Sequence, residues 1–132
     1  MANTGMGEKR PLSPHLQIYR PNLTMMMSIL HRITGAALYF AILLGVWWLA
    51  ALAAGPGYFA FVDGLFRSWF GLVVLAGTVY GLFHHLMGGV RHLIWDTGAA
   101  FSIEDAERMD WLSLAAAAAL TAIVFVAGYA AL

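Results

Sequence analysis

Five histidines are the residues of this sequence best suited to chemistry, because an apolar membrane spacer needs no imidazole. His84 and His85 lie deepest, since His85 is six residues before Arg91 and so about 9 Å inward along a helix. Ionisable groups at such depth are costly and usually face the interior of a helix bundle. An imidazole there can bind a metal, relay protons or hydrogen-bond to a neighbouring helix.

His85 belongs to a narrow stripe on a helical wheel of about 100° per residue. The stripe combines imidazole with small or polar residues, namely Thr78, Gly81, Gly89, His92 and Asp96, and Gly88 borders it. Such a face has room for a flat macrocycle whose iron is bound by His85. His84 points about 100° away on that wheel, so one planar group is not expected to use both. The alternative is that the small residues only let helices pack closely around a hydrogen-bonded histidine.

One histidine gives one axial ligand, so a second ligand is expected from another chain unless His31 supplies it. Ser28 and Arg32 lie four residues apart and are neighbours on one helix face, with His31 at its edge. An arginine beside a hydroxyl at the membrane edge suits a quinone carbonyl or a haem propionate. The alternative is a snorkelling arginine with a helix-capping serine.

The elements that position these residues follow from the composition. Hydrophobic residues make up 61% of the 132 residues and charged residues 11%, so the lipid bilayer is the expected solvent. Three segments lack Asp, Glu, Lys and Arg, namely 33–62, 68–90 and 111–132, and a spanning helix needs about 20 apolar residues. We predict an all-α membrane protein with three transmembrane helices, at about 26–53, 67–95 and 111–131.

Residues 1–25 contain three prolines and are expected to form an irregular arm on the membrane surface, with residues 26–132 as the membrane domain. Gly55, Pro56 and Gly57 predict a turn between the first two spans. An acidic loop is expected before the third span. Six of the seven Lys and Arg residues lie on the side of the N-terminus and this loop, and only Arg67 lies opposite. The N-terminus is therefore predicted to face the cytoplasm or the mitochondrial matrix.

Composition also excludes several functions. The absence of cysteine removes disulfides, thiolate catalysis, cysteine-ligated clusters and covalent haem attachment. A net charge of zero argues against a nucleic-acid partner. No signal peptide is expected before the spans.

Two stretches carry a family resemblance. The first is Arg10-Pro-Leu-Ser-Pro-His-Leu-Gln-Ile-Tyr19, followed by Ser28-Ile-Leu-His-Arg-Ile-Thr-Gly35, and the second is His85-Leu-Met-Gly-Gly-Val-Arg-His-Leu-Ile-Trp-Asp-Thr-Gly98. Together they resemble the cytochrome b subunit of succinate dehydrogenase, the membrane anchor of respiratory complex II. The likeness covers nearly the whole chain.

The resemblance implies a haem b shared with a second small anchor subunit, with His85 as this chain's axial ligand. It places His31, Arg32, His92 and Gly89 beside the haem. It also implies that Ser28, Arg32 and Asp96 contribute to a ubiquinone site.

The expected partners are the second anchor, the iron–sulfur subunit, the flavoprotein and the bilayer. This chain would then be a subunit of the enzyme without carrying the succinate-oxidising site, because it has neither a G-x-G-x-x-G fingerprint nor cysteines. A bacterial inner membrane is the expected location, with the mitochondrial inner membrane as the alternative. The rival functions are a haem-free structural anchor and a small proton-relaying transporter.

Overall fold

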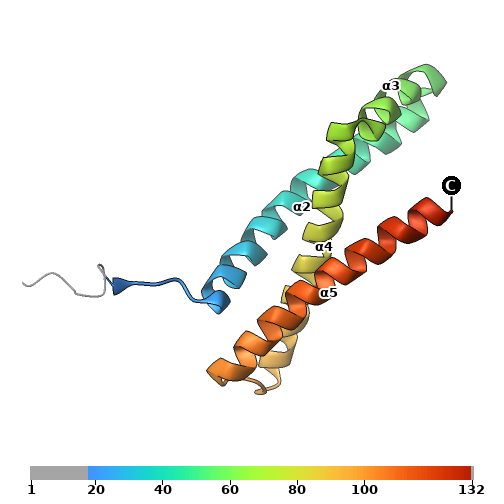
Figure 1. Ribbon diagram of the computed structural model, residues 1–132. Coiled ribbons are helices and arrows are strands. Elements are labelled where there is room, and N and C mark those ends of the chain that lie inside the picture. The colour runs from blue at the N-terminus through green and yellow to red at the C-terminus, as the bar shows by residue number, and fades with distance from the viewer. Residues whose placement is uncertain (1–17, 132) are drawn as a thin grey trace, which may run out of the picture.

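The computed structural model of the chain describes residues 18–131. This part consists of three long helices, α2 (Leu23–Ala54), α4 (Trp69–Asp96) and α5 (Ile103–Ala130), and one short helix, α3 (Pro56–Arg67) (Figure 1). Each long helix is long and apolar enough to cross a membrane. The predicted all-α architecture with three transmembrane helices is therefore confirmed.

A polar side chain caps the start of each long helix. Asn22 accepts from the backbone N–H of Met25 at 2.8 Å, and Ser102 accepts from that of Asp105 at 3.1 Å. Ser68 caps α4 in the same way. These caps satisfy N–H groups that the first helical turn leaves unpaired. α2 consequently begins three residues before the expected span, and α5 begins eight residues before it.

The structure differs from the sequence-based expectation at the two segments that connect the spanning helices. The turn at 55–57 is limited to Gly55, with φ of 119°, and Pro56 then occupies the first turn of α3, where its missing N–H costs nothing. The acidic loop is largely the first two turns of α5, where Glu104 and Asp105 complement the helix dipole. Of the arm expected at 1–25, residues 1–17 lie outside the described part of the chain, and α2 already includes its last three residues.

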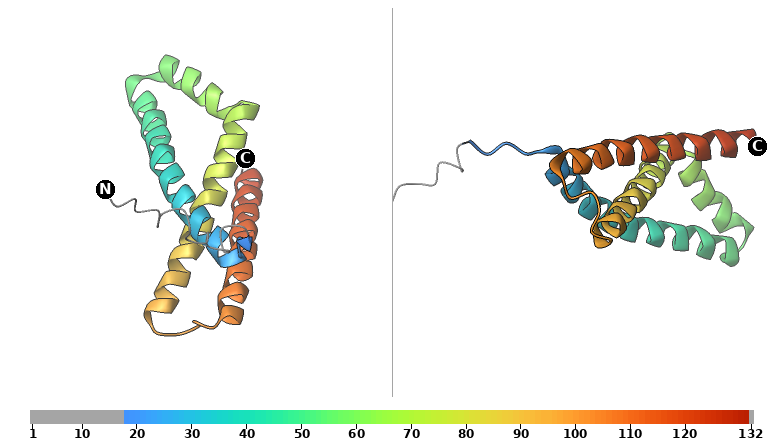
Figure 2. Two further views of the ribbon diagram at one scale, coloured as in Figure 1. Left: turned by 90° about the vertical axis from the view of Figure 1, so that its left-hand side faces the viewer. Right: turned by 90° about the horizontal axis from the view of Figure 1, so that it is seen from below.

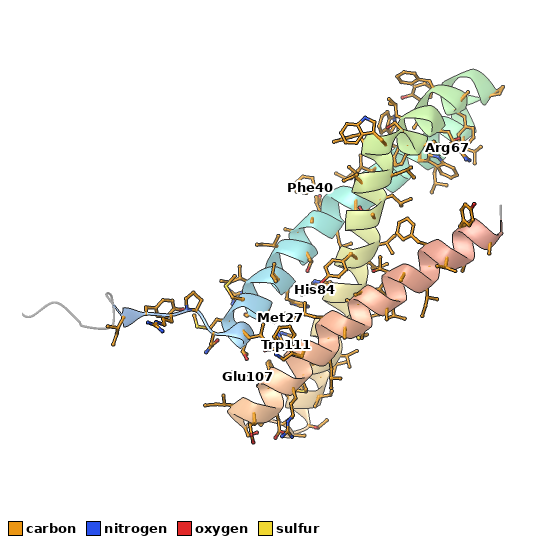
Figure 3. All side chains as sticks on the ribbon, viewed as in Figure 1. Met27, Phe40, Arg67, His84, Glu107 and Trp111 are labelled. Atoms are coloured by element: carbon orange, nitrogen blue, oxygen red, sulfur yellow. The ribbon has the colours of Figure 1, made fainter. Side chains whose placement is uncertain are left out.

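The helices form an open assembly. α2 and α4 cross in one half of the molecule and diverge toward α3, which closes the third side of a triangle, while α5 runs back along α4 (Figures 1 and 2). The start of α2, the end of α4 and the start of α5 share one end of the bundle. Arg67 lies at the opposite end from Glu107 (Figure 3).

The buried core is small. Met27, Ala51, Val62 and Ala117 are the buried apolar residues among those described, whereas large apolar side chains cover the outer faces of the helices. In a bilayer, lipid or another subunit covers such faces. The fold therefore leaves wide lateral surfaces and concentrates its polar contacts in a few places.

Candidate functional site

His31 on α2 and His85 on α4 form a reciprocal pair. Their rings are stacked, with centroids 4.0 Å apart and planes 3° from parallel. His85 donates from Nδ1 to the carbonyl of His31 at 3.0 Å, and His31 donates from Nε2 to the carbonyl of His85 at 3.2 Å. A carbonyl can only accept, so these contacts place the protons on Nδ1 of His85 and on Nε2 of His31.

Two glycines make this pair possible. A Cβ on Gly35 would come within 2.8 Å of Cε1 of His85, and a Cβ on Gly88 would overlap the ring of His31. Each ring therefore lies against the bare backbone of the opposite helix. The room expected for a macrocycle at Gly88 is taken by His31, whereas a Cβ on Gly89 would meet no atom within 4 Å. Of the glycines that neighbour His85 on the helix, only Gly89 faces open space.

The donor chemistry of His85 fits iron binding. A metal-binding histidine usually donates its second ring N–H to a carbonyl or carboxylate, which fixes the tautomer and the ring orientation. The contact from Nδ1 to His31 does this, and it leaves the lone pair on Nε2, which has no hydrogen-bond partner within residues 18–131. No group of three or more His, Cys, Asp or Glu side chains in that range is placed to hold a bare metal ion. A single imidazole instead suits an iron whose other ligands come from a macrocycle.

His84 is in a different environment from His85. Its side chain is only 2% exposed, and neither ring nitrogen has a hydrogen-bond partner among the described residues. The nearest aromatic ring is Tyr80, 6.0 Å away between centroids, and Figure 3 shows His84 part-way along the bundle. Protein atoms cover this ring almost completely, so it does not face an open surface of the described chain. His85, which is only partly buried, remains the better candidate.

The other predicted site residues lie at the same end of the bundle. The ring of His92 is 5.3 Å from that of His31, so the structure brings His31, His85 and His92 into one cluster. Arg32 and Asp96 are exposed, and neither forms an ion pair with another residue in 18–131. Ser28, one turn before Arg32, is partly buried. Within the described residues, the structure thus joins the histidines directly and leaves Arg32 and Asp96 without an ion-pair partner.

Sequence reasoning missed a buried ionic contact beside this cluster. Arg91 and Asp110 are 2% and 0% exposed and form an ion pair between α4 and α5. Thr24 of α2 donates to Asp110 at 2.7 Å, and the guanidinium carbon of Arg91 lies 4.9 Å from the ring centroid of Trp95. The sequence contained one signal for this contact, because Arg91 and Asp110 each border an apolar segment. Charged side chains are rarely buried at such positions unless they pair with an opposite charge.

A second polar cluster lies at the opposite end of the bundle, where hydrogen bonds join α3 to α2. Asp63 accepts from Arg67 at 2.5 Å and from the indole of Trp48 at 3.2 Å, while Trp47 donates to the hydroxyl of Tyr58 at 2.9 Å. The hydrogen bond from Arg67, and then that from Trp48, lower the pKa of Asp63. This cluster is remote from the histidines and has a structural role.

Three membrane-length helices, two of which are joined by a pair of stacked imidazoles, define a helical subunit of a membrane protein. The sequence profile of the succinate dehydrogenase/fumarate reductase transmembrane subunit matches residues 6–125. The chain belongs to this family.

Individual relatives agree with the family match. The succinate dehydrogenase cytochrome b556 subunit of Paracoccus denitrificans is 45% identical over 128 residues, which cover 95% of this chain and 98% of the relative. The b556 subunit of Rickettsia conorii is 37% identical over 89% of this chain and 92% of the relative. The b560 subunit of Reclinomonas americana is 33% identical over 92% and 88%. The chain is thus similar to these subunits over almost their full lengths.

Proposed function

We propose that this chain is the haem b-binding membrane anchor of a succinate:quinone oxidoreductase and forms part of its ubiquinone-reduction site. Family membership supports the role of anchor. The observation that carries the haem assignment is the hydrogen bond from Nδ1 of His85 to His31, which leaves Nε2 as a free base. In a haem-free anchor the two hydrogen bonds would only join α2 to α4, and the unpartnered Nε2 of His85 would have no role.

His85 would hold the haem iron through Nε2, and the second anchor subunit would supply the other protein ligand. The haem would add one-electron redox chemistry to the bundle. Gly89, one helical turn after His85, leaves space on α4, since a Cβ there would meet no atom within 4 Å. His31 stacks on His85, His92 lies beside His31, and Arg32 follows His31 in the chain; all three side chains can donate hydrogen bonds to propionates.

Ubiquinone would bind at the same end of the bundle, next to Ser28 and Arg32. A hydroxyl and a guanidinium both donate to carbonyl oxygens, and the guanidinium favours the negative charge that develops there as electrons arrive. Reduction to the quinol also requires two protons. We assign their delivery to Asp96, whose exposed carboxylate ends α4, and to His31.

Succinate oxidation belongs to partner subunits in this proposal. The chain has no cysteine for iron–sulfur clusters and no G-x-G-x-x-G fingerprint, so a flavoprotein and an iron–sulfur subunit must carry that chemistry. We place the chain in a bacterial inner membrane with its N-terminus in the cytoplasm. The excess of Lys and Arg on that side and the bacterial relatives support this location.

Purification of the chain through a tag tests the proposal. We expect co-purification of subunits with succinate-to-dye activity, together with a reduced-minus-oxidised spectrum of haem b. Active soluble subunits without any haem absorption would support the haem-free anchor. Isolation of the chain without partners or chromophore would contradict both.

A further inference from the structure

Asp110 joins all three long helices. It lies on α5, its side chain is fully buried, and its two carboxylate oxygens are used by two different helices. Oδ1 pairs with Arg91 of α4, and Oδ2 accepts a 2.7 Å hydrogen bond from Oγ1 of Thr24 on α2. We call these three residues the Asp110 junction.

Each member of the junction depends on the others. A buried carboxylate or guanidinium is very unfavourable without its partner, so the Arg91–Asp110 pair fixes the relative placement of α4 and α5. Thr24 then attaches α2 to this fixed pair. Among side-chain hydrogen bonds and ion pairs within residues 18–131, the Thr24–Asp110 contact is the one that links α2 to α5.

The attached segment is the first turn of α2. Helix ends fray unless side chains hold them, and here the cap Asn22, the buried side chain of Met27 and the Thr24 hydrogen bond do so. Ser28 follows Thr24 by four residues and Arg32 follows Ser28 by four, so all three lie along one side of the helix. The position of Thr24 therefore determines where Ser28 and Arg32 are presented.

On α4, the Asp110 junction lies next to the histidine cluster. Arg91 directly precedes His92, whose ring lies 5.3 Å from that of His31. The junction thus holds α2 and α4 together on the side of the histidine cluster that faces the start of α2. None of its three side chains is among the residues assigned to quinone or haem.

We propose that Thr24 and Asp110 are positioning residues of the quinone site, which act by holding Ser28 in register with the end of α4. The inference rests on the proposed placement of the quinone at Ser28 and Arg32. Because binding groups must be held to within a fraction of an ångström, loosening the first turn weakens quinone binding before it affects assembly.

Thr24→Val tests the inference in the intact membrane complex. Valine keeps the shape of threonine but loses the hydroxyl, so we expect a roughly fivefold to tenfold rise in the KM for ubiquinone, the size of one lost hydrogen bond. The kcat for quinone should change less than KM, and succinate-to-dye activity and the haem spectrum should not change. Thr24→Ser should restore the wild-type KM. Thr121→Val is the matched control, because Thr121 donates only to Ala117 of its own helix.

A double-mutant cycle separates positioning from a general structural role. If Thr24 acts through Ser28, Thr24→Val should raise KM much less in a Ser28→Ala background than in the wild type. Equal effects in both backgrounds overturn the inference. If Thr24→Val fails to assemble, Thr24→Ala removes the same hydroxyl with less bulk and provides the same comparison.

The outcomes also distinguish this inference from the proposed function. An unchanged KM in Thr24→Val, while Arg32→Leu impairs quinone reduction, overturns the positioning role and leaves the quinone site standing. Unimpaired quinone reduction in Arg32→Leu and Ser28→Ala removes the site itself, and the positioning role falls with it.

Discussion

The ring of His31 lies parallel to the ring of His85, with centroids 4.0 Å apart. The lone pair of an imidazole nitrogen lies in the ring plane, so stacked rings cannot direct their nitrogens at one iron from opposite sides. In this arrangement the two rings would not hold one iron between them. His31 instead fixes the orientation of His85, because its carbonyl accepts a hydrogen bond from Nδ1–H and leaves Nε2 without a hydrogen-bond partner among residues 18–131.

The close contact at Gly88 gives a direct test of the histidine pair. Gly88→Ala places a methyl group where the ring of His31 lies, so His31 must move and lose its contact with His85. We expect a loss of about 1–3 kcal/mol in stability, as for other overpacked sites, and a shifted haem spectrum. Thermal unfolding of the purified complex measures the first effect. Gly45→Ala is the control, since a Cβ there meets no atom within 4 Å, and equal midpoints for the two variants would disprove the contact.

Arg32 is predicted to act on the quinone and not on succinate. Arg32→Leu removes a charged donor that stabilises developing negative charge, so succinate-to-quinone activity should fall by about a hundredfold. Succinate-to-dye activity, measured on the same preparation, should stay close to that of the wild type. Arg67→Leu, at the opposite end of the bundle, should leave the KM for quinone unchanged. Parallel loss of both activities in Arg32→Leu would mean that the substitution only disrupts assembly.

Asp63 gives a prediction for pH dependence. Its pKa is lowered in the folded chain by the hydrogen bonds from Arg67 and Trp48, so the ionised carboxylate favours the folded state. This stabilisation is fully present above the unfolded-state pKa and is lost as the pH falls through the lower folded-state pKa. Asp63→Asn should therefore lower the thermal midpoint by a constant amount above about pH 5, with a smaller difference in more acidic buffer. A difference that grows on acidification would contradict the assignment.

The number of spanning helices could be predicted from the sequence, because a long segment without charged residues is the clearest sign of a helix that crosses a bilayer. The helix ends could not be read so well, since capping by Asn22 and Ser102 extends helices into polar sequence that resembles a loop. α3 was hidden for a related reason: Gly-Pro-Gly predicts a turn, yet proline is also favourable in the first turn of a helix.

For the candidate site, features within one helix could be predicted from the sequence, whereas contacts between two helices could not. The stripe containing His85 was visible on a wheel of one helix, and so was the proximity of Ser28 to Arg32. A wheel contains no information on how two helices are rotated against each other, so it could not show that His31 fills the space at Gly88. The pairing of Asp110 with Arg91 likewise joins residues from two helices and required their relative placement.

The most direct test of the account compares His85→Ala with His84→Ala in the purified complex by reduced-minus-oxidised visible spectroscopy. The two residues are adjacent, but only His85 combines an anchored Nδ1 with partial exposure, whereas His84 is enclosed by protein. We expect His85→Ala to abolish or strongly alter the haem b signal and His84→Ala to keep it. A normal signal in His85→Ala, together with its loss in His84→Ala, would contradict the assignment of His85 as the ligand.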